Sequence, residues 1–310
     1  MGALLNKLTS IFQNPPEAPI VETKINRRAL AHAREVLKID DTKYFNIAVA
    51  GKQNAGKSTF INALCGRANF ERGDDIAEAC PLETTRKPKA FYASRFPHLR
   101  LYDLPGFGTL DIHSDNYLDK YIFNEGVCAM YCILLFYESG IPQEFARFVK
   151  EAKKYNVNLA IIHSKADQVL KNYHKNDNPV MFPTIDQEAA NRVVKLLLEV
   201  FEKKKQQPEY KLFRNIPCFV ISSHKLLDEF GKKQYNGGAD IEEYLEYQEQ
   251  DLLQFISKLK DIEKIENDIR KEVLTYMHIS CIQQAKFISR KWMQTIQNNN
   301  NELPKKKNSH

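Results

Sequence analysis

One short stretch restricts the fold of this chain more than any other: a strand, a glycine-bounded loop and a helix in direct succession. The apolar run 45–50 (FNIAVA) ends at Gly51, and Gly56, Lys57 and Ser58 follow at the spacing G-x-x-x-x-G-K-S. After Ser58, apolar residues recur at helical spacing. The backbone N–H groups of such a loop surround phosphate groups, and the helix that follows adds the positive end of its dipole. The stretch therefore predicts a phosphate-binding loop.

Two side chains of this loop have direct roles in that prediction. Lys57 would reach the β- and γ-phosphates and act in catalysis, and the Ser58 hydroxyl would ligate Mg²⁺. An ordinary strand-to-helix turn is the alternative, and the flanking strand and helix make it the weaker one. The residues that we assign to the nucleotide phosphates are Gly51, Asn54, Ala55, Gly56, Lys57, Ser58 and Thr59.

Apolar runs alternate with helical segments along the middle of the chain. The runs are FNIAVA (45–50), LRLYDL (99–104), AMYCILLF (129–136), LAIIHS (159–164) and CFVIS (218–222). This alternation predicts an α/β fold with a mainly parallel sheet. We expect an extra strand at 91–93 to pair with 99–104.

Helical patterns flank this region on both sides. An apolar stripe on one helix face runs through residues 1–14, a second helix is expected at 22–38, and residues 239–303 contain neither Gly nor Pro. We therefore predict an all-α domain that is built from N- and C-terminal helices. The predicted boundaries are 1–40 for the N-terminal helices, 41–230 for the nucleotide-binding domain, 231–297 for the C-terminal helical region and 298–310 for a solvated tail.

Composition excludes several classes of function. The net charge of the 310 residues is only +6 with both signs interspersed, which is too weak to predict a nucleic-acid partner. Six Cys without metal-ligand spacing indicate reduced thiols and a cytoplasmic location. No apolar run is long enough to span a bilayer, and the start of the chain lacks the layout of a secretion signal.

Three further stretches follow the loop in order, each at the end of a predicted strand. Asp103 ends LRLYDL, where a carboxylate would hold Mg²⁺, and Gly106 would let a backbone N–H approach the γ-phosphate. Asp167 of Ser164-Lys-Ala-Asp would take both guanine N–H donors, while the stem of Lys165 covers the ring. Adenine offers no such pair of donors, so the pattern predicts GTP and GDP over ATP. The base would be backed by the pair that closes CFVIS, namely Ser222 and Ser223.

The connection before residue 99 and two unusual residues bear on hydrolysis. Glu83-Thr-Thr85 lies in a long connection that is suited to a switch closing on Mg²⁺ and the γ-phosphate. Phe107 occupies the position where many small G proteins carry a Gln that orients water, so either hydrolysis is slow or another group, such as Glu83 or Arg86, places the water. Ser164 replaces the usual Asn of N-K-x-D, which should weaken the tether to the phosphate loop.

These motifs resemble the immunity-related GTPases of the dynamin-like superfamily. The resemblance covers about residues 45–230 and rests on GKQNAGKSTFINAL, PLETTRKP, LYDLPGFGT, HSKAD and FVISSHKLLDEF. It implies a Ras-like P-loop G domain between helical segments, with Thr85 as the switch threonine that contacts Mg²⁺ and Glu83 as the acidic residue that activates water. It also implies nucleotide-dependent self-association, as a homodimer or with relatives, and action on intracellular membranes in defence. The C-terminal helical region is shorter than the resemblance would require.

Three hypotheses compete on this evidence. The leading one is a GTPase that dimerises with GTP bound, and the second is a guanine-nucleotide scaffold or regulator with little hydrolysis. The third is a membrane-remodelling protein, for which the apolar stripe Leu4/Leu5/Leu8/Ile11/Phe12 and an acylated Gly2 would supply peripheral attachment. Docking of the same stripe inside the helical domain is the alternative to membrane contact.

Overall fold

The computed structural model describes residues 2–16, 20, 26–67, 76–77, 88–105, 117–177, 182–230 and 245–259. All of these belong to one compact unit, residues 1–260, while residues 261–310 form a second. The domain boundaries expected near residues 40 and 230 stay predictions.

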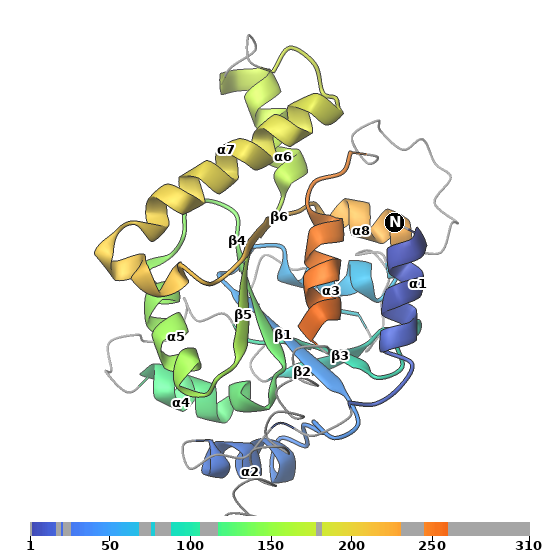
Figure 1. Ribbon diagram of the computed structural model, residues 1–310, viewed down its shortest axis with the longest axis vertical. Helices are drawn as coiled ribbons and strands as arrows, with labels where there is room; N and C mark the ends of the chain where they lie inside the picture. Colours follow the sequence, from blue (N-terminus) through green and yellow to red (C-terminus); the bar gives the residue numbers. More distant parts are fainter. Residues whose placement is uncertain are drawn as a thin grey trace, which may run out of the picture. The chain divides into compact units, whose positions relative to one another are not determined.

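The elements of the first unit follow the chain order strand–helix over most of its length (Figure 1). The strands are β1 (Phe45–Gly51), β2 (Lys89–Tyr92), β3 (Leu99–Asp103), β4 (Cys132–Tyr137), β5 (Asn158–His163) and β6 (Cys218–Val220). The α-helices are α1 (Gly2–Ile11), α2 (Arg27–Glu35), α3 (Lys57–Leu64), α4 (Tyr117–Asn124), α5 (Gln143–Lys154), α6 (Ala166–Asn172), α7 (Gln187–Lys205), α8 (Ser223–Phe230) and a further helix over 249–259. Shorter helical turns are η1 (Val127–Ala129), η2 (Tyr173–Asp177) and η3 (Pro208–Phe213).

The strands form one sheet in the order β2-β3-β1-β4-β5-β6. Five of them are parallel, and β2 pairs antiparallel with β3 through Phe91 opposite Leu101. All residues of β1 and β4 are buried, as expected for central parallel strands that are covered on both faces. The mainly parallel α/β sheet and the extra strand are both confirmed, and the carboxyl ends of the five parallel strands lie along one edge.

Helices cover both faces of the sheet with separate apolar clusters (Figure 1). On one face the core takes side chains from α1, α3, α8 and 249–259, for example Leu8, Phe60, Leu226 and Leu252. On the other face it takes them from α2, α4, α5 and η3, for example Leu30, Ile122, Phe148 and Phe213. The helices α6 and α7 share a smaller cluster with Leu245.

The N-terminal helix α1 packs against the sheet core. Leu8 and Phe12 are buried, and the Phe12 ring meets Phe45 and Phe96 edge-to-face at centroid distances of 5.4 and 5.8 Å. The described part of the apolar stripe is thus buried inside the molecule, in the cluster that the sheet shares with helix 249–259. Over the described residues, no helix combines the length and apolarity needed to cross a bilayer.

The start of the fourth strand differs from expectation. The run 129–136 predicts strand from Ala129, but β4 begins at Cys132, because the 3-10 turn η1 occupies the start of the run up to Ala129. The paired register with β1 starts at Cys132 opposite Ile47. Every residue of this run is buried, so apolarity alone cannot mark where pairing begins. Helix α2 is likewise shorter than the predicted 22–38, and residues 21–25 lie outside the described chain.

Candidate functional site

The loop between β1 and α3 is shaped by three residues with positive φ. A Cβ on Gly51 would lie 2.2 Å from the carbonyl oxygen of Phe136, which faces it across the β1–β4 pairing. Farther along, Asn54 and Gly56 have φ values of 62° and 79°. Only glycine fits at position 51, and the left-handed residues turn the loop back on itself in the manner of a phosphate cradle.

Lys57 is the first residue of α3, and its ammonium group folds over the loop. Nζ donates to Lys52 O at 2.9 Å and to Gly51 O at 3.3 Å. The first turn of α3 carries no acidic side chain, so the lysine charge and the positive end of the helix dipole add. An anion such as a nucleotide phosphate fits this site.

The candidate magnesium residues lie next to this loop. Asp103 ends β3, is 4% exposed and is paired in register with Val49 of β1, while Ser58 lies in the first turn of α3. A hydroxyl and a carboxylate supply the hard oxygen ligands that Mg²⁺ prefers. In the described part of the chain, no three acidic, His or Cys side chains group as a metal site. These two residues therefore fit Mg²⁺ only if nucleotide phosphates complete its coordination.

Ser164 connects the phosphate loop to the base side of the site. Its buried hydroxyl, with the residue 1% exposed, donates to Ala55 O at 2.8 Å and also lies 3.2 Å from Tyr137 O. The tether that we expected this serine to weaken is present, although one hydroxyl proton serves two carbonyls. The two motifs that are 109 positions apart in sequence are thus brought together.

The loop after β5 carries the candidate guanine ligands. Lys165 takes a left-handed conformation (φ 59°) before α6, and its ammonium group forms an ion pair with Glu138, the residue after β4. Asp167 follows in the first turn of α6 and is half-buried. The N–H of Ala166 donates to Ile221 O at 3.1 Å, which joins this loop to the one after β6.

The pair Ser222–Ser223 is buried and is held from a distant part of the chain. The Ser222 N–H donates to Glu249 Oε1 at 2.7 Å, and Glu249 Oε2 accepts the N–H of Tyr247 at 2.8 Å. Burial raises the pKa of the Glu249 carboxyl to about 7, although both N–H groups favour its charged form.

Sequence reasoning missed two residues of this site. Glu138 comes two residues after the predicted strand 129–136, so the rule that ligands collect at strand ends was a usable signal. Glu249 lies within a helical pattern and shows no local signal. Of the predicted residues, Glu83, Thr85 and Gly106, together with Arg86 and Phe107, lie outside the described chain, and their assignments stay predictions.

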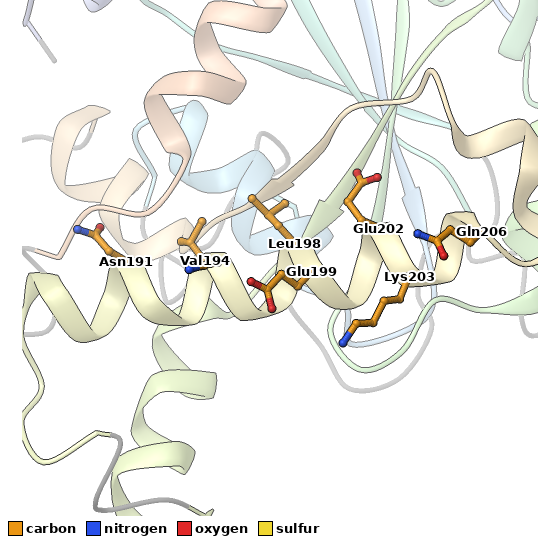
Figure 2. A pocket seen from close by; sticks show the side chains of 8 residues that line it. Asn191, Val194, Leu198, Glu199, Glu202, Lys203 and Gln206 are labelled. Carbon is orange, nitrogen blue, oxygen red and sulfur yellow. The ribbon is translucent and has the colours of Figure 1, made fainter.

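A hollow of about 570 Å³ lies along α7, away from these loops (Figure 2). The described residues that line it lie on that helix or at its C-cap, Gln206, with Val194 and Leu198 among charged neighbours such as Glu199 and Lys203. It contains none of the predicted nucleotide residues, and we assign it no role in the site.

The sheet order, the phosphate loop between β1 and α3 and the loops after β3, β5 and β6 define a P-loop GTP-binding domain. Structural matches include Toc33 of Arabidopsis thaliana (13% identity, 81% of this chain and 95% of that chain, TM-score 0.39). They also include Era of Aquifex aeolicus (18% identity, 70% and 57%, TM-score 0.38). Both TM-scores are low, and the residue-level roles rest on the site itself.

The family follows from the sequence. The model of the family described as interferon-inducible GTPase (IIGP) matches residues 17–302, and the chain belongs to this family. The resemblance to immunity-related GTPases is thereby confirmed.

Curated relatives cover only parts of the chain. Mouse interferon-gamma-inducible GTPase 10 is 36% identical over 131 residues, which are 42% of this chain and 30% of that protein. Mouse T-cell-specific guanine nucleotide triphosphate-binding protein 2 is 30% identical over 156 residues, 50% and 36% of the two chains. Human immunity-related GTPase family M protein is 26% identical over 141 residues, 46% and 74%. The matched segments span about a third of the two mouse relatives.

Proposed function

We propose that this protein binds GTP and GDP with Mg²⁺ and hydrolyses GTP to GDP and phosphate. The observation that carries the proposal is the hydrogen bond from Ser164 Oγ to Ala55 O, because it joins the candidate base loop to the phosphate loop. A loop that binds phosphate alone would not need this connection to the strand end that carries Asp167.

Each residue has a stated task in this proposal. The loop N–H groups and Lys57 bind the phosphates and stabilise the charge that develops on the transferring phosphoryl group. Ser58, Thr85 and Asp103 would hold Mg²⁺, which supplies charge neutralisation between the phosphates when bound. Asp167 and Lys165 select guanine, Ser222 and Ser223 back it, Gly106 approaches the γ-phosphate, and Glu83 orients the attacking water.

Family membership also supports a proposal about the assembly of this protein and its role in the cell. We propose nucleotide-dependent self-association, as a homodimer or with relatives, and action at intracellular membranes in cell-autonomous defence, from a cytoplasmic location. Support comes from family membership and from the names of the relatives, which are interferon-inducible or immunity-related GTPases. Flotation of the full chain with anionic vesicles, with and without GTP, tests the membrane part, and failure to float in both conditions would exclude it.

Hydrolysis measured against protein concentration tests the enzyme. We expect phosphate release to rise more than linearly with concentration and to be lost in Lys57→Ala, while Lys150→Ala on the exposed face of α5 keeps it. A flat specific activity would remove self-association from the mechanism, and tighter binding of ATP than of GTP would overturn the guanine assignment.

A guanine-nucleotide scaffold with little or no hydrolysis is the second candidate. Phe107 favours it, because a phenyl ring cannot orient water as the usual Gln does. GTP that co-purifies with the protein and persists without phosphate release would establish the scaffold in place of the enzyme.

A further inference from the structure

Residues 246–249 lie alongside β6 and hold it with two neighbouring side chains. The Gln248 N–H donates to Val220 O at 2.9 Å, and Gln248 Oε1 accepts the Val220 N–H at 3.0 Å. One residue on, Glu249 Oε1 accepts the Ser222 N–H at 2.7 Å. The neutral amide of Gln248 thus hydrogen-bonds β6, and the carboxylate of Glu249 hydrogen-bonds the loop that follows β6.

Burying the Glu249 carboxylate is unfavourable in solvation free energy. It is 1% exposed, and its charged form loses solvation on burial. Among the described residues, the buried Lys225 of α8 favours the charged form of Glu249, and the Lys225 ammonium itself lies 3.9 Å from the Glu246 carboxylate. Gln248 attaches this segment to β6 through one amide oxygen, whereas Glu249 presents two acceptor oxygens, one to Ser222 of the base loop and one to Tyr247.

We propose that Glu249 is a positioning residue for guanine recognition, and this rests on the proposed role of Ser222–Ser223. By accepting the Ser222 N–H, it fixes the orientation of the loop and leaves the N–H of Ser223, at the start of α8, as the donor to the guanine carbonyl oxygen. It also couples the base site to helix 249–259, so that nucleotide binding and docking of this helix stabilise each other.

Three diphosphates separate this role from a general loss of stability. GDP and IDP share the base carbonyl oxygen that Ser223 would bind, ADP lacks it, and IDP lacks only the amino group assigned to Asp167. Glu249→Gln leaves one acceptor oxygen for the two N–H donors of Ser222 and Tyr247 and turns an NH2 group towards one of them. We expect this to lower GDP and IDP affinity together, by about fivefold to tenfold, and to leave ADP affinity unchanged. In calorimetric titrations, the ratio of GDP affinity to ADP affinity should therefore fall, while the ratio of GDP affinity to IDP affinity should stay constant.

Gln248→Ala is the matched control, because it removes the neighbouring bond to β6 without touching Ser222. We expect it to lower the free energy of unfolding while the GDP-to-ADP ratio is kept. Equal ratios in Glu249→Gln and the unaltered protein, or a ratio that falls as far in Gln248→Ala, would overturn the proposal. A wild-type protein that does not prefer GDP to ADP would instead refute the proposed function.

A pH series on the unaltered protein keeps the proposal testable if Glu249→Gln does not fold. Titration of the phosphates affects GDP and ADP alike, so it does not change the ratio of their affinities. We expect this ratio to fall between about pH 8 and pH 6 as Glu249 gains a proton. His163, whose carbonyl accepts the Ile221 N–H at 2.9 Å, has its pKa lowered from 6.5 by burial and stays neutral over most of this range. A ratio that does not change with pH would contradict the role of the carboxylate.

Discussion

The phosphate side and the base side of this site are built in different ways. On the phosphate side, the backbone determines the shape: a glycine pressed against β4, two left-handed residues and the start of α3 all lie between Gly51 and Lys57. On the base side, side chains hold the loops: Glu138 pairs with Lys165, and Glu249 accepts from Ser222, each across 27 positions of sequence.

The two sides of the site should therefore differ in how they tolerate substitutions. A backbone-built cradle fails when a single atom is added, since no rotamer can relieve a clash with a main-chain carbonyl. A side-chain-built pocket instead loses affinity in steps, one hydrogen bond or ion pair at a time, and each step responds to pH or salt. The following predictions separate the two sides, beginning with the largest effect.

Gly51→Ala should be the most damaging of these substitutions. Its Cβ would lie 2.2 Å from Phe136 O, and the φ of 144° is unfavourable for alanine, so we expect a loss of at least about 3 kcal/mol in the free energy of unfolding. Gly140→Ala is the control: its φ is also positive, at 61°, but nothing lies within 4 Å, and we expect about 1 kcal/mol. Urea denaturation measures both, and equal losses would show that backbone conformation, and not the close approach, matters at position 51.

The same difference explains how much could be predicted from sequence. The phosphate loop and the five parallel strands follow from local patterns, because the residues that form them are neighbours in the chain. The start of β4 could not be found, since the run from Ala129 is uniformly apolar while pairing begins at Cys132. Glu249 could not be found either, because its role depends on the return of 246–249 to β6, a contact that leaves no local periodicity.

Glu249 should make stability depend on pH. Its pKa is raised from 4.5 to about 7 by burial, so the folded state binds the proton more tightly than the unfolded chain. The contribution is fully present below about pH 4.5 and is lost as the pH rises through about 7, with a size of about 3 kcal/mol for this shift. We expect Glu249→Gln to flatten the fall in unfolding free energy over this window, as measured by denaturation at a series of pH values.

Glu125 provides the comparison for that measurement. Burial also raises its pKa to about 7, but the residue is less enclosed and follows α4 on the connection to the amino end of β4, whereas the nucleotide loops follow the carboxyl ends of the strands. Glu125→Gln should therefore flatten the same window by a smaller amount and leave guanine selectivity unchanged. A pH profile that neither substitution alters would mean that other groups control stability in this range.

Ser164→Ala tests the link between the two sides. It removes the hydroxyl that donates to Ala55 O and approaches Tyr137 O, and we expect a loss of about 1 to 2 kcal/mol in unfolding free energy. Because the lost bond supports the phosphate loop, affinities for GDP and ADP should fall by the same factor. A selective loss of GDP affinity would show that this serine belongs to the base side.

Glu138→Gln should have the smallest effect, because both members of its ion pair with Lys165 are partly exposed. We expect GDP affinity to fall about twofold at low salt, since the lysine stem loses its anchor beside the base, and the difference to shrink at high salt. Glu151→Gln breaks a comparable pair with Lys154 on α5, away from the site, and should not change GDP affinity. If GDP affinity is unaltered in Glu138→Gln at low salt, the left-handed backbone of Lys165 is sufficient to hold this residue beside the base. Backbone conformation would then determine part of the base side as well.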